Sequence, residues 1–117
     1  MFINAATFDT LRSVAFGSLT TSYAILGSEL SNPAVLIGFK NATDGTVLIS
    51  FDGINDNLVL PPQSMAVYDL RTNAPGREGA CDYLFPKSAA ILVKYTGTAP
   101  SLGSFYAEVL LAIPRSD

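Results

Sequence analysis

The sequence predicts a small all-β domain, an antiparallel β-sandwich with a jelly-roll-like arrangement of about seven or eight strands. Three observations support this fold class. Apolar residues alternate with a period of two from residue 34 onward, short clusters of Pro, Gly, Asp and Asn separate the alternating runs, and no stretch shows a convincing helical period. The length of 117 residues, without a change in composition along the chain, predicts a single domain over 1–117.

The strands follow from the alternation, taken in chain order. Residues 13–28 are expected to form one or two strands interrupted at Gly17. The first clear strand is expected at 34–40, where Val35, Ile37 and Phe39 share one face. Asp-Gly pairs supply the positive φ that tight hairpins need, so the later strands are expected to follow one another as a meander. These later strands are predicted at 46–51, 57–60, 65–70 and 89–95, closed by 105–113.

Two segments are less regular. Residues 1–12 are expected to form an irregular N-terminal arm. Residues 71–88, rich in Gly, Pro and charge, are expected to form a long loop, and loops of that length are commonly functional or ordered by a partner.

The composition excludes several function classes. Only 15% of the residues are charged, against about 25% in a typical soluble domain, which suggests that other subunits cover part of the surface. The seven basic residues are spread along a chain of net charge -3, so nucleic-acid binding is not expected. No apolar run approaches the ~20 residues of a membrane span, and the N-terminus lacks the pattern of a signal peptide, so a cytoplasmic site of synthesis is expected.

Catalysis is not expected either. The chain has no histidine, no nucleophile elbow, no P-loop and no dinucleotide fingerprint, and no cofactor is predicted. A carboxylate pair remains the alternative, with Asp52 or Asp56 partnering Asp69 or Glu108. The one cysteine, Cys81, excludes an internal disulfide and is interpreted as an inert, partly buried thiol.

The stretch 52–57 gathers oxygen-bearing side chains that resemble calcium ligands: Asp52, Asn55, Asp56 and Asn57. It lacks the alternating acidic spacing and the distal glutamate of the known calcium loop. Because Asp, Asn and Gly are also the residues that turns favour, we interpret the stretch as a turn and predict no metal.

Several aromatic residues offer an alternative function, because aromatic rings can stack on sugars. More often such residues pack inside a sandwich or at an interface. A carbohydrate-binding module therefore remains the alternative from another class, and its candidate platform is Tyr68, Tyr83, Phe85, Tyr95 and Tyr106.

Over residues 30–113 the chain resembles small virion structural proteins of tailed bacteriophages. The matching motifs are turn-and-strand motifs: Asn32-Pro33-Ala34, Ser50-Phe51-Asp52-Gly53, Leu60-Pro61, Tyr68-Asp69-Leu70, Phe85-Pro86-Lys87 and Gly103-Ser104-Phe105-Tyr106. Ser88 departs from the pattern, since a glycine is expected after the Pro-Lys pair.

The resemblance implies a building block of the phage particle, made in the bacterial cytoplasm and incorporated into the virion. We favour a capsid decoration (cement) protein that contacts itself and the major capsid protein; the alternatives are a head–tail or collar component and a tail-fibre domain. Assembly contacts are predicted in 1–12 and 71–87, at Met1, Phe2, Ile3, Phe8, Arg12, Arg71, Arg77, Tyr83, Phe85 and Lys87.

Overall fold

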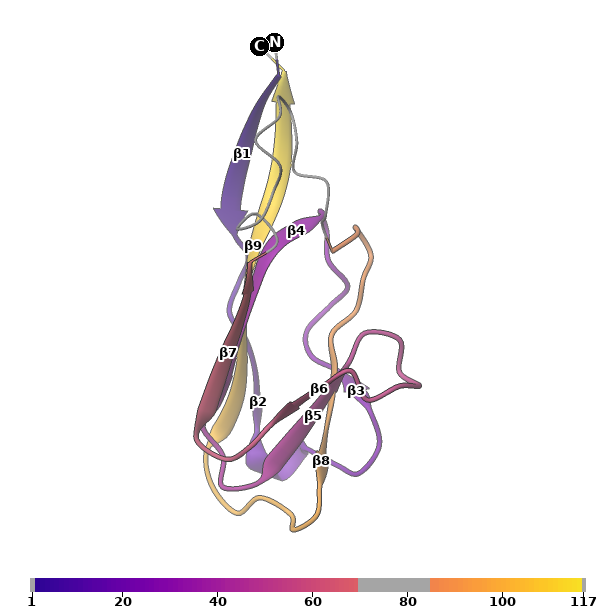
Figure 1. The fold of residues 1–117 in the computed structure, drawn as a ribbon, viewed down its shortest axis with the longest axis vertical. Helices are drawn as coiled ribbons and strands as arrows, with labels where there is room; N and C mark the ends of the chain where they lie inside the picture. The colour runs from indigo at the N-terminus through magenta and orange to yellow at the C-terminus, as the bar shows by residue number, and fades with distance from the viewer. Residues whose placement is uncertain (1, 70–84, 117) are drawn as a thin grey trace.

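The computed structural model describes residues 2–69 and 85–116, with side chains described over 6–69 and 85–112. Within these residues the regular elements are nine strands and one short 3-10 helix, η1 (Phe16–Ser18). The strands are β1 (Phe2–Phe8), β2 (Arg12–Ala15), β3 (Ala24–Ile25), β4 (Ala34–Asn41), β5 (Thr46–Ser50), β6 (Leu58–Leu60), β7 (Ser64–Asp69), β8 (Leu92–Thr96) and β9 (Ser104–Ser116) (Figure 1). No helix in the described part of the chain is long and apolar enough to cross a membrane.

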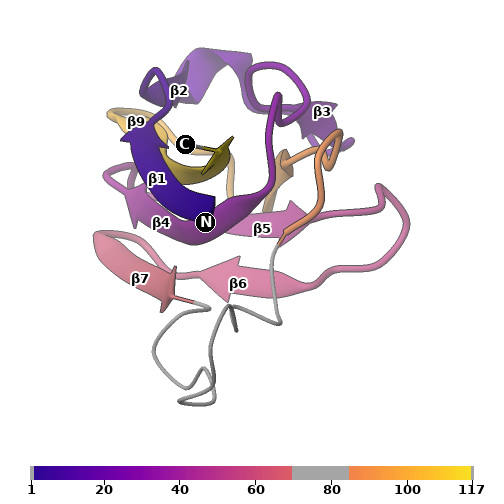
Figure 2. The same ribbon diagram turned by 90° about the horizontal axis from the view of Figure 1, so that it is seen from above.

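The strand pairing is nested. The antiparallel pairs are β2 with β9, β3 with β8, β4 with β7 and β5 with β6, as if one long hairpin had been rolled up. Rolling brings β4 beside β9 and β5 beside β8, which gives one sheet of order β1-β9-β4-β7, with β2 also on β9, and a second of order β3-β8-β5-β6. Viewed along the long axis, β9, β4 and β7 lie to one side of β3, β5 and β6 (Figure 2). The predicted jelly-roll-like sandwich is confirmed.

The expected meander is wrong, however. The β5–β6 pair is a hairpin across the Asp52–Asn57 turn, as predicted. In contrast, β4 and β5 lie in different sheets, and so do β8 and β9. The reason is that β7 and β9 occupy both edges of β4, which leaves no edge for β5, so the short connection after β4 crosses from one sheet to the other.

The inward positions of both sheets make the core. Alternate residues of β4, β5, β8 and β9 are almost completely buried, as the period of two predicts. Fully burying each such side chain contributes about 1.5–3 kcal/mol. The most deeply buried large side chains are Leu26, Leu30, Ile37, Val47, Ile49, Ile91, Phe105 and Val109.

The crossover from β4 to β5 is held by a buried amide. Asn41 is 1% exposed, and its Nδ2 donates to the carbonyl oxygens of Gly45 at 2.9 Å, Leu60 at 3.0 Å and Pro61 at 3.1 Å. Its Oδ1 accepts from the backbone N–H of Thr43 at 3.0 Å and from the Thr43 hydroxyl at 2.7 Å. One side chain therefore satisfies polar backbone groups of two segments, 43–45 and 60–61, inside the protein.

The β8–β9 connection packs against the same crossover. The carboxylate of Asp44 accepts hydrogen bonds from the hydroxyl and backbone N–H of Ser101 and from the N–H of Leu102, which lowers the pKa of Asp44. Gly103, at φ +85°, approaches so closely that a Cβ there would lie 2.1 Å from the carbonyl oxygen of Ala42. Only glycine fits this position without moving backbone.

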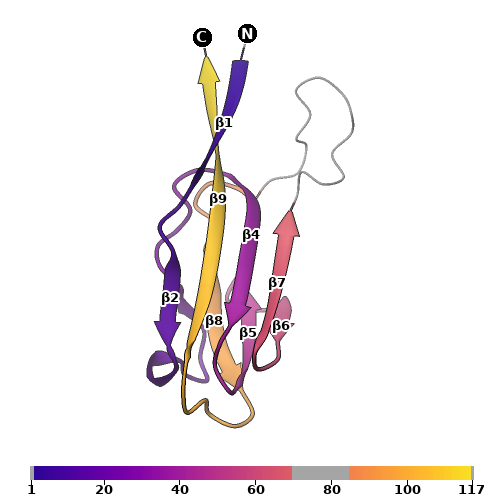
Figure 3. The same ribbon diagram turned by 90° about the vertical axis from the view of Figure 1, so that its left-hand side faces the viewer.

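The N-terminal arm is not irregular, which corrects the expectation for 1–12. Residues 2–8 form β1, which pairs in continuous register with residues 110–116. The cause is the length of β9: on the edge opposite β4, β2 pairs only with residues 104–107, and β1 pairs with residues 110–116 of the same edge. The resulting two-stranded ribbon extends beyond the sandwich and carries both termini at its tip (Figure 3). The molecule measures 52 × 24 × 24 Å.

Arg12, at the start of β2, lies inside the fold. It is 6% exposed, and its Nη1 donates to the carbonyl oxygens of Leu26, at 3.0 Å, and Ser28. Its Nη2 forms a 2.8 Å ion pair with Asp9, and the hydrogen bond from Arg12 is the main reason that the pKa of Asp9 is lowered. This guanidinium ties the bend between β1 and β2 to the β3–β4 connection.

Candidate functional site

The outward face of the β1-β9-β4-β7 sheet is unusually apolar. Antiparallel sheets with one buried face usually carry polar residues on the other. Here β7 turns Met65 and Val67 outward, with exposed fractions of 69% and 63%, while Ala66 lies on the opposite side of the strand. The strand β7 therefore carries apolar residues on both faces. This pattern is visible in the sequence, but the predicted contact residues did not include Met65 or Val67.

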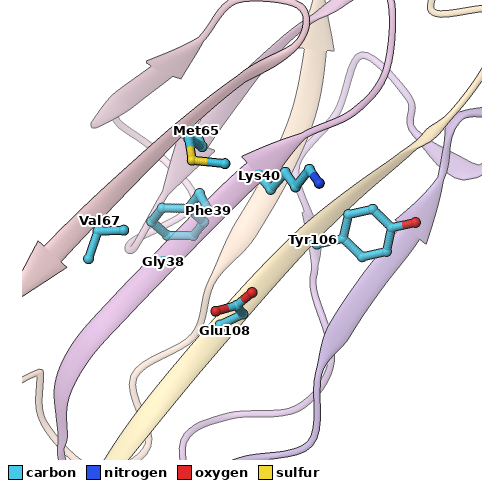
Figure 4. Close-up of a pocket in the computed structure, with 7 residues that line it drawn as sticks. All are labelled: Gly38, Phe39, Lys40, Met65, Val67, Tyr106 and Glu108. Atoms are coloured by element: carbon cyan, nitrogen blue, oxygen red, sulfur yellow. The ribbon is translucent and has the colours of Figure 1, made fainter.

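A shallow hollow of about 160 Å³ lies on this face (Figure 4). Its floor is Gly38 of β4, which the strand register places between Val67 of β7 and Glu108 of β9. Because Gly38 has no side chain, its neighbours stand above it as walls. The lining residues are Gly38, Phe39, Lys40, Met65, Val67, Tyr106 and Glu108.

Two opposite charges flank the hollow. Lys40 and Glu108 are both exposed, and neither makes a hydrogen bond or ion pair with the described residues. The register places Lys40 opposite Tyr106 and Gly38 opposite Glu108, so the two charges lie on diagonal positions of adjacent strands. An apolar floor between one free cation and one free anion suits contact with another protein surface better than it suits chemistry on a small molecule.

The opposite sheet also presents apolar residues to solvent, Ile25 at 47% exposed and Val59 at 58%. Unlike Lys40 and Glu108, the charged side chains of Asp56 and Lys94 beside this sheet have partners within the fold. The Tyr23 hydroxyl donates to Asp56, and Lys94 Nζ lies 3.6 Å from Asp56 Oδ1 and 4.5 Å above the Tyr23 ring. Burial, followed by the hydrogen bond to Asp56, raises the pKa of Tyr23. These three side chains connect the segment before β3, the β5–β6 turn and β8.

The Asp52 turn binds its own backbone. The Asp52 carboxylate accepts from the N–H groups of Ile54 and Asn55, from Asn55 Nδ2 and from the Ser50 hydroxyl, each at 2.8 Å. These hydrogen bonds, with the backbone ones first, lower the pKa of Asp52. Asn57 Oδ1 accepts from the N–H of Phe51 instead. The oxygens thus serve different partners in the turn, which supports the turn interpretation.

The described aromatic residues do not form one platform. Phe85 and Tyr95 pack against the core, and Tyr68 lies edge-on against Phe39 with ring centroids 6.3 Å apart. Tyr106 lines the hollow on the outward face. Tyr83 lies outside the described residues.

The predicted assembly residues are scattered in the structure. Phe8 is 70% exposed and Lys87 is exposed, so both are available to a neighbour. Arg12 is buried, with Nη1 and Nη2 hydrogen-bonded within the fold and Nε without a partner among the described residues. Phe85 is half-buried against the core. Phe2 and Ile3 belong to β1. Met1, Arg71, Arg77 and Tyr83 lie outside the described residues.

Comparison with known proteins supports the fold. No family model and no curated protein matches the chain. Among solved structures, a chain from the acidic stable capsid of Helicobacter pylori bacteriophage KHP30 has a similar fold, with a TM-score of 0.59 over 100% of both chains and 11% sequence identity. A chain from the Bacillus endospore appendages, which form disulfide-linked pili, gives a TM-score of 0.45 and 11% identity over 96% of this chain and 88% of that one. The jelly-roll fold of this protein is therefore also that of a phage capsid chain.

Proposed function

We propose that this chain is a structural protein of a bacteriophage particle, and within the particle a decoration protein that stabilises the shell through contacts with the major capsid protein and with its own copies. The observation that carries the proposal is the end-to-end agreement of its fold with a chain of a phage capsid. The motifs that resemble virion proteins of tailed phages, over residues 30–113, support the same setting.

The surface chemistry agrees with a role in assembly. A free soluble domain gains little from exposed Met65 and Val67 beside unpaired Lys40 and Glu108. Contiguous exposed apolar surface that is rimmed by charge is typical of a contact between proteins. The proposal assigns the hollow over Gly38 to the contact with the shell and assigns no catalytic step to the chain.

The first test is the copy number in the particle. Density-banded particles from the source of this protein are digested, and the protein is quantified by mass spectrometry relative to the major capsid protein. Hundreds of copies per particle support decoration of the shell. Six or a dozen copies would place the protein at the collar or tail instead, and absence from the particle would overturn the virion role.

The second test addresses the surface. Particles that lack the protein are incubated with the purified Val67→Glu variant, which places a charge beside the hollow. Ile54→Glu is the matched control, because Ile54 is 84% exposed at the β5–β6 turn, far from this face in the fold. We expect Val67→Glu to lose at least tenfold in occupancy and Ile54→Glu to bind normally. Equal binding of the two variants would refute the assigned surface.

A further inference from the structure

The edges of the two sheets differ in how they are protected against pairing with other strands. Natural edge strands are kept short, or carry charges or proline, because a long uncharged edge is a template for another strand. Among the described edges, β3 and β6 span two and three residues, β2 has four, and β7 carries Asp69. In contrast, β1 has seven residues, Phe-Ile-Asn-Ala-Ala-Thr-Phe, with neither a charge nor a proline.

The other edge of the terminal ribbon is protected by a proline. The N–H of Ala112 donates to the carbonyl oxygen of Pro33 at 2.7 Å, so even-numbered residues of β9 direct their N–H groups away from β1. Pro114 therefore stands on the edge that β4 leaves open, where it offers no donor. The open edge of β1 is thus the unprotected side of the ribbon.

The backbone groups on this open edge are defined by the register. Asp9 N–H donates to the carbonyl oxygen of Val109, so odd-numbered residues of this segment face β9. The N–H and C=O groups of the even-numbered residues consequently point outward: Phe2, Asn4, Ala6 and Phe8. Beyond Leu111, β1 is the only described strand beside β9, and a ribbon of two strands is only marginally stable in water.

We propose that β1 pairs with β1 of a second copy of this chain, antiparallel, across a two-fold axis at Ala5. A phenylalanine lies three residues from Ala5 on each side, so this register places Phe2 opposite Phe8 of the second copy and Ile3 opposite Thr7. Aromatic pairs opposite each other on adjacent strands stabilise antiparallel sheets. The outward groups of Phe2 and Asn4 then exchange both hydrogen bonds with those of Phe8 and Ala6.

The resulting contact is isologous and closes on itself, because the same edge is used by both copies. It joins the two ribbons into one sheet of order β9-β1-β1-β9, with the two sandwiches at opposite ends. This pairing goes beyond the proposed place in a virion and does not depend on it, since it requires only the purified chain.

The test is a register-specific crosslink in a Cys81→Ser background. In the proposed register Ala5 faces Ala5 of the second copy as a non-hydrogen-bonded pair, with Cα atoms about 4.5 Å apart, close enough for a disulfide. The Ala5→Cys variant is therefore expected to form a covalent dimer under mild oxidation. Ile3→Cys is the matched control, because Ile3 faces Thr7 and the two Ile3 positions are far apart; the double variant Ile3→Cys with Thr7→Cys is expected to crosslink again.

Sedimentation equilibrium of the unmodified chain gives the second measurement. A dimer is expected. Ala6→Pro is expected to raise the dissociation constant of the dimer at least tenfold, because the lost N–H points to the open edge and not to β9. Circular dichroism of the monomer confirms that the sandwich is retained. A monomeric unmodified chain, a trimer, or equal crosslinking of Ala5→Cys and Ile3→Cys would overturn the proposal. None of these outcomes bears on whether the protein is found in particles.

Discussion

Replacing Asn41 by alanine tests whether one buried amide holds the crossover between the two sheets. The side chain donates to the carbonyl oxygens of Gly45, Leu60 and Pro61 and accepts two hydrogen bonds from Thr43. After truncation, Gly45 keeps the Thr43 hydroxyl as a partner and Pro61 keeps the Ser64 hydroxyl. The backbone N–H of Thr43 loses its hydrogen bond to Oδ1, and the carbonyl oxygen of Leu60 loses the amide but stays in the strand pair with Val47.

The expected magnitude follows from those two groups. A buried donor or acceptor left without a partner costs about 1–3 kcal/mol. The Thr43 N–H without its partner, together with the net loss of the hydrogen bond to Leu60 at about 1 kcal/mol, gives an expected loss of about 3 kcal/mol in the free energy of unfolding. For a domain of this size that corresponds to a fall of roughly 10 °C in Tm. Asn41→Asp is expected to be worse at neutral pH, because an ionised carboxylate would face three carbonyl oxygens.

The assay is equilibrium unfolding in urea, followed by far-UV circular dichroism, with Asn55→Ala as the control. Asn55 is exposed, and its amide donates to Asp52 at the surface. We expect the control to lose less than about 1 kcal/mol and the slope m to stay constant across the variants, so that the midpoints report stability. If Asn41→Ala loses no more than Asn55→Ala, the amide is not what holds the crossover.

Three further predictions concern single residues. Gly103→Ala is expected to cost at least about 2 kcal/mol, because its Cβ would overlap a carbonyl oxygen at φ +85°; Gly17→Ala, with open space around it, should melt within a few degrees of the parent. Ser88 has φ 73° in the turn after Pro86-Lys87, a conformation that is strained for serine and not for glycine. Ser88→Gly is therefore expected to increase the free energy of unfolding by about 0.5 kcal/mol, seen as a higher urea midpoint. A lower midpoint would contradict the strain. The pKa of Asp9 is lowered by Arg12 in the folded state, so the stability it contributes is present above about pH 4 and is lost as the pH falls through the folded pKa. A pH series should therefore show a shallower acid decline for Asp9→Asn, and equal slopes would refute this linkage.

Local pattern was enough to predict the strands but not their partners. The alternation in 34–40 and 46–51 predicted two strands with buried inward faces, which the structure has at Ala34–Asn41 and Thr46–Ser50, and the Asp-Gly at 52–53 correctly indicated a hairpin. The Asp-Gly at 44–45 has the same composition but connects different sheets. The difference lies in Asn41, whose contacts with Leu60 and Pro61 come from residues about twenty positions away.

The N-terminus shows the same limit. Residues 2–8 have no charge and no clear period, so they read as an arm, and their partner lies more than a hundred residues along the chain. Arg12 was predicted as an assembly contact, although the structure buries it. The nearby Asp9, three residues earlier, was a signal that the cation has a partner. Ser88 is a case where the resemblance helped: the expected glycine marks a position that the structure places at positive φ.

The central position of β9 has a consequence for how the protein is made. This strand completes its sheet by pairing with β1, β2 and β4, yet it lies at the C-terminal end of the chain. During translation, Phe2–Phe8 and Ala34–Asn41 leave the ribosome long before Ser104–Ser116 exists to cover them. Pairings so distant in sequence form slowly, on the scale of milliseconds to seconds, so the nascent chain exposes unpaired strand edges until β9 emerges.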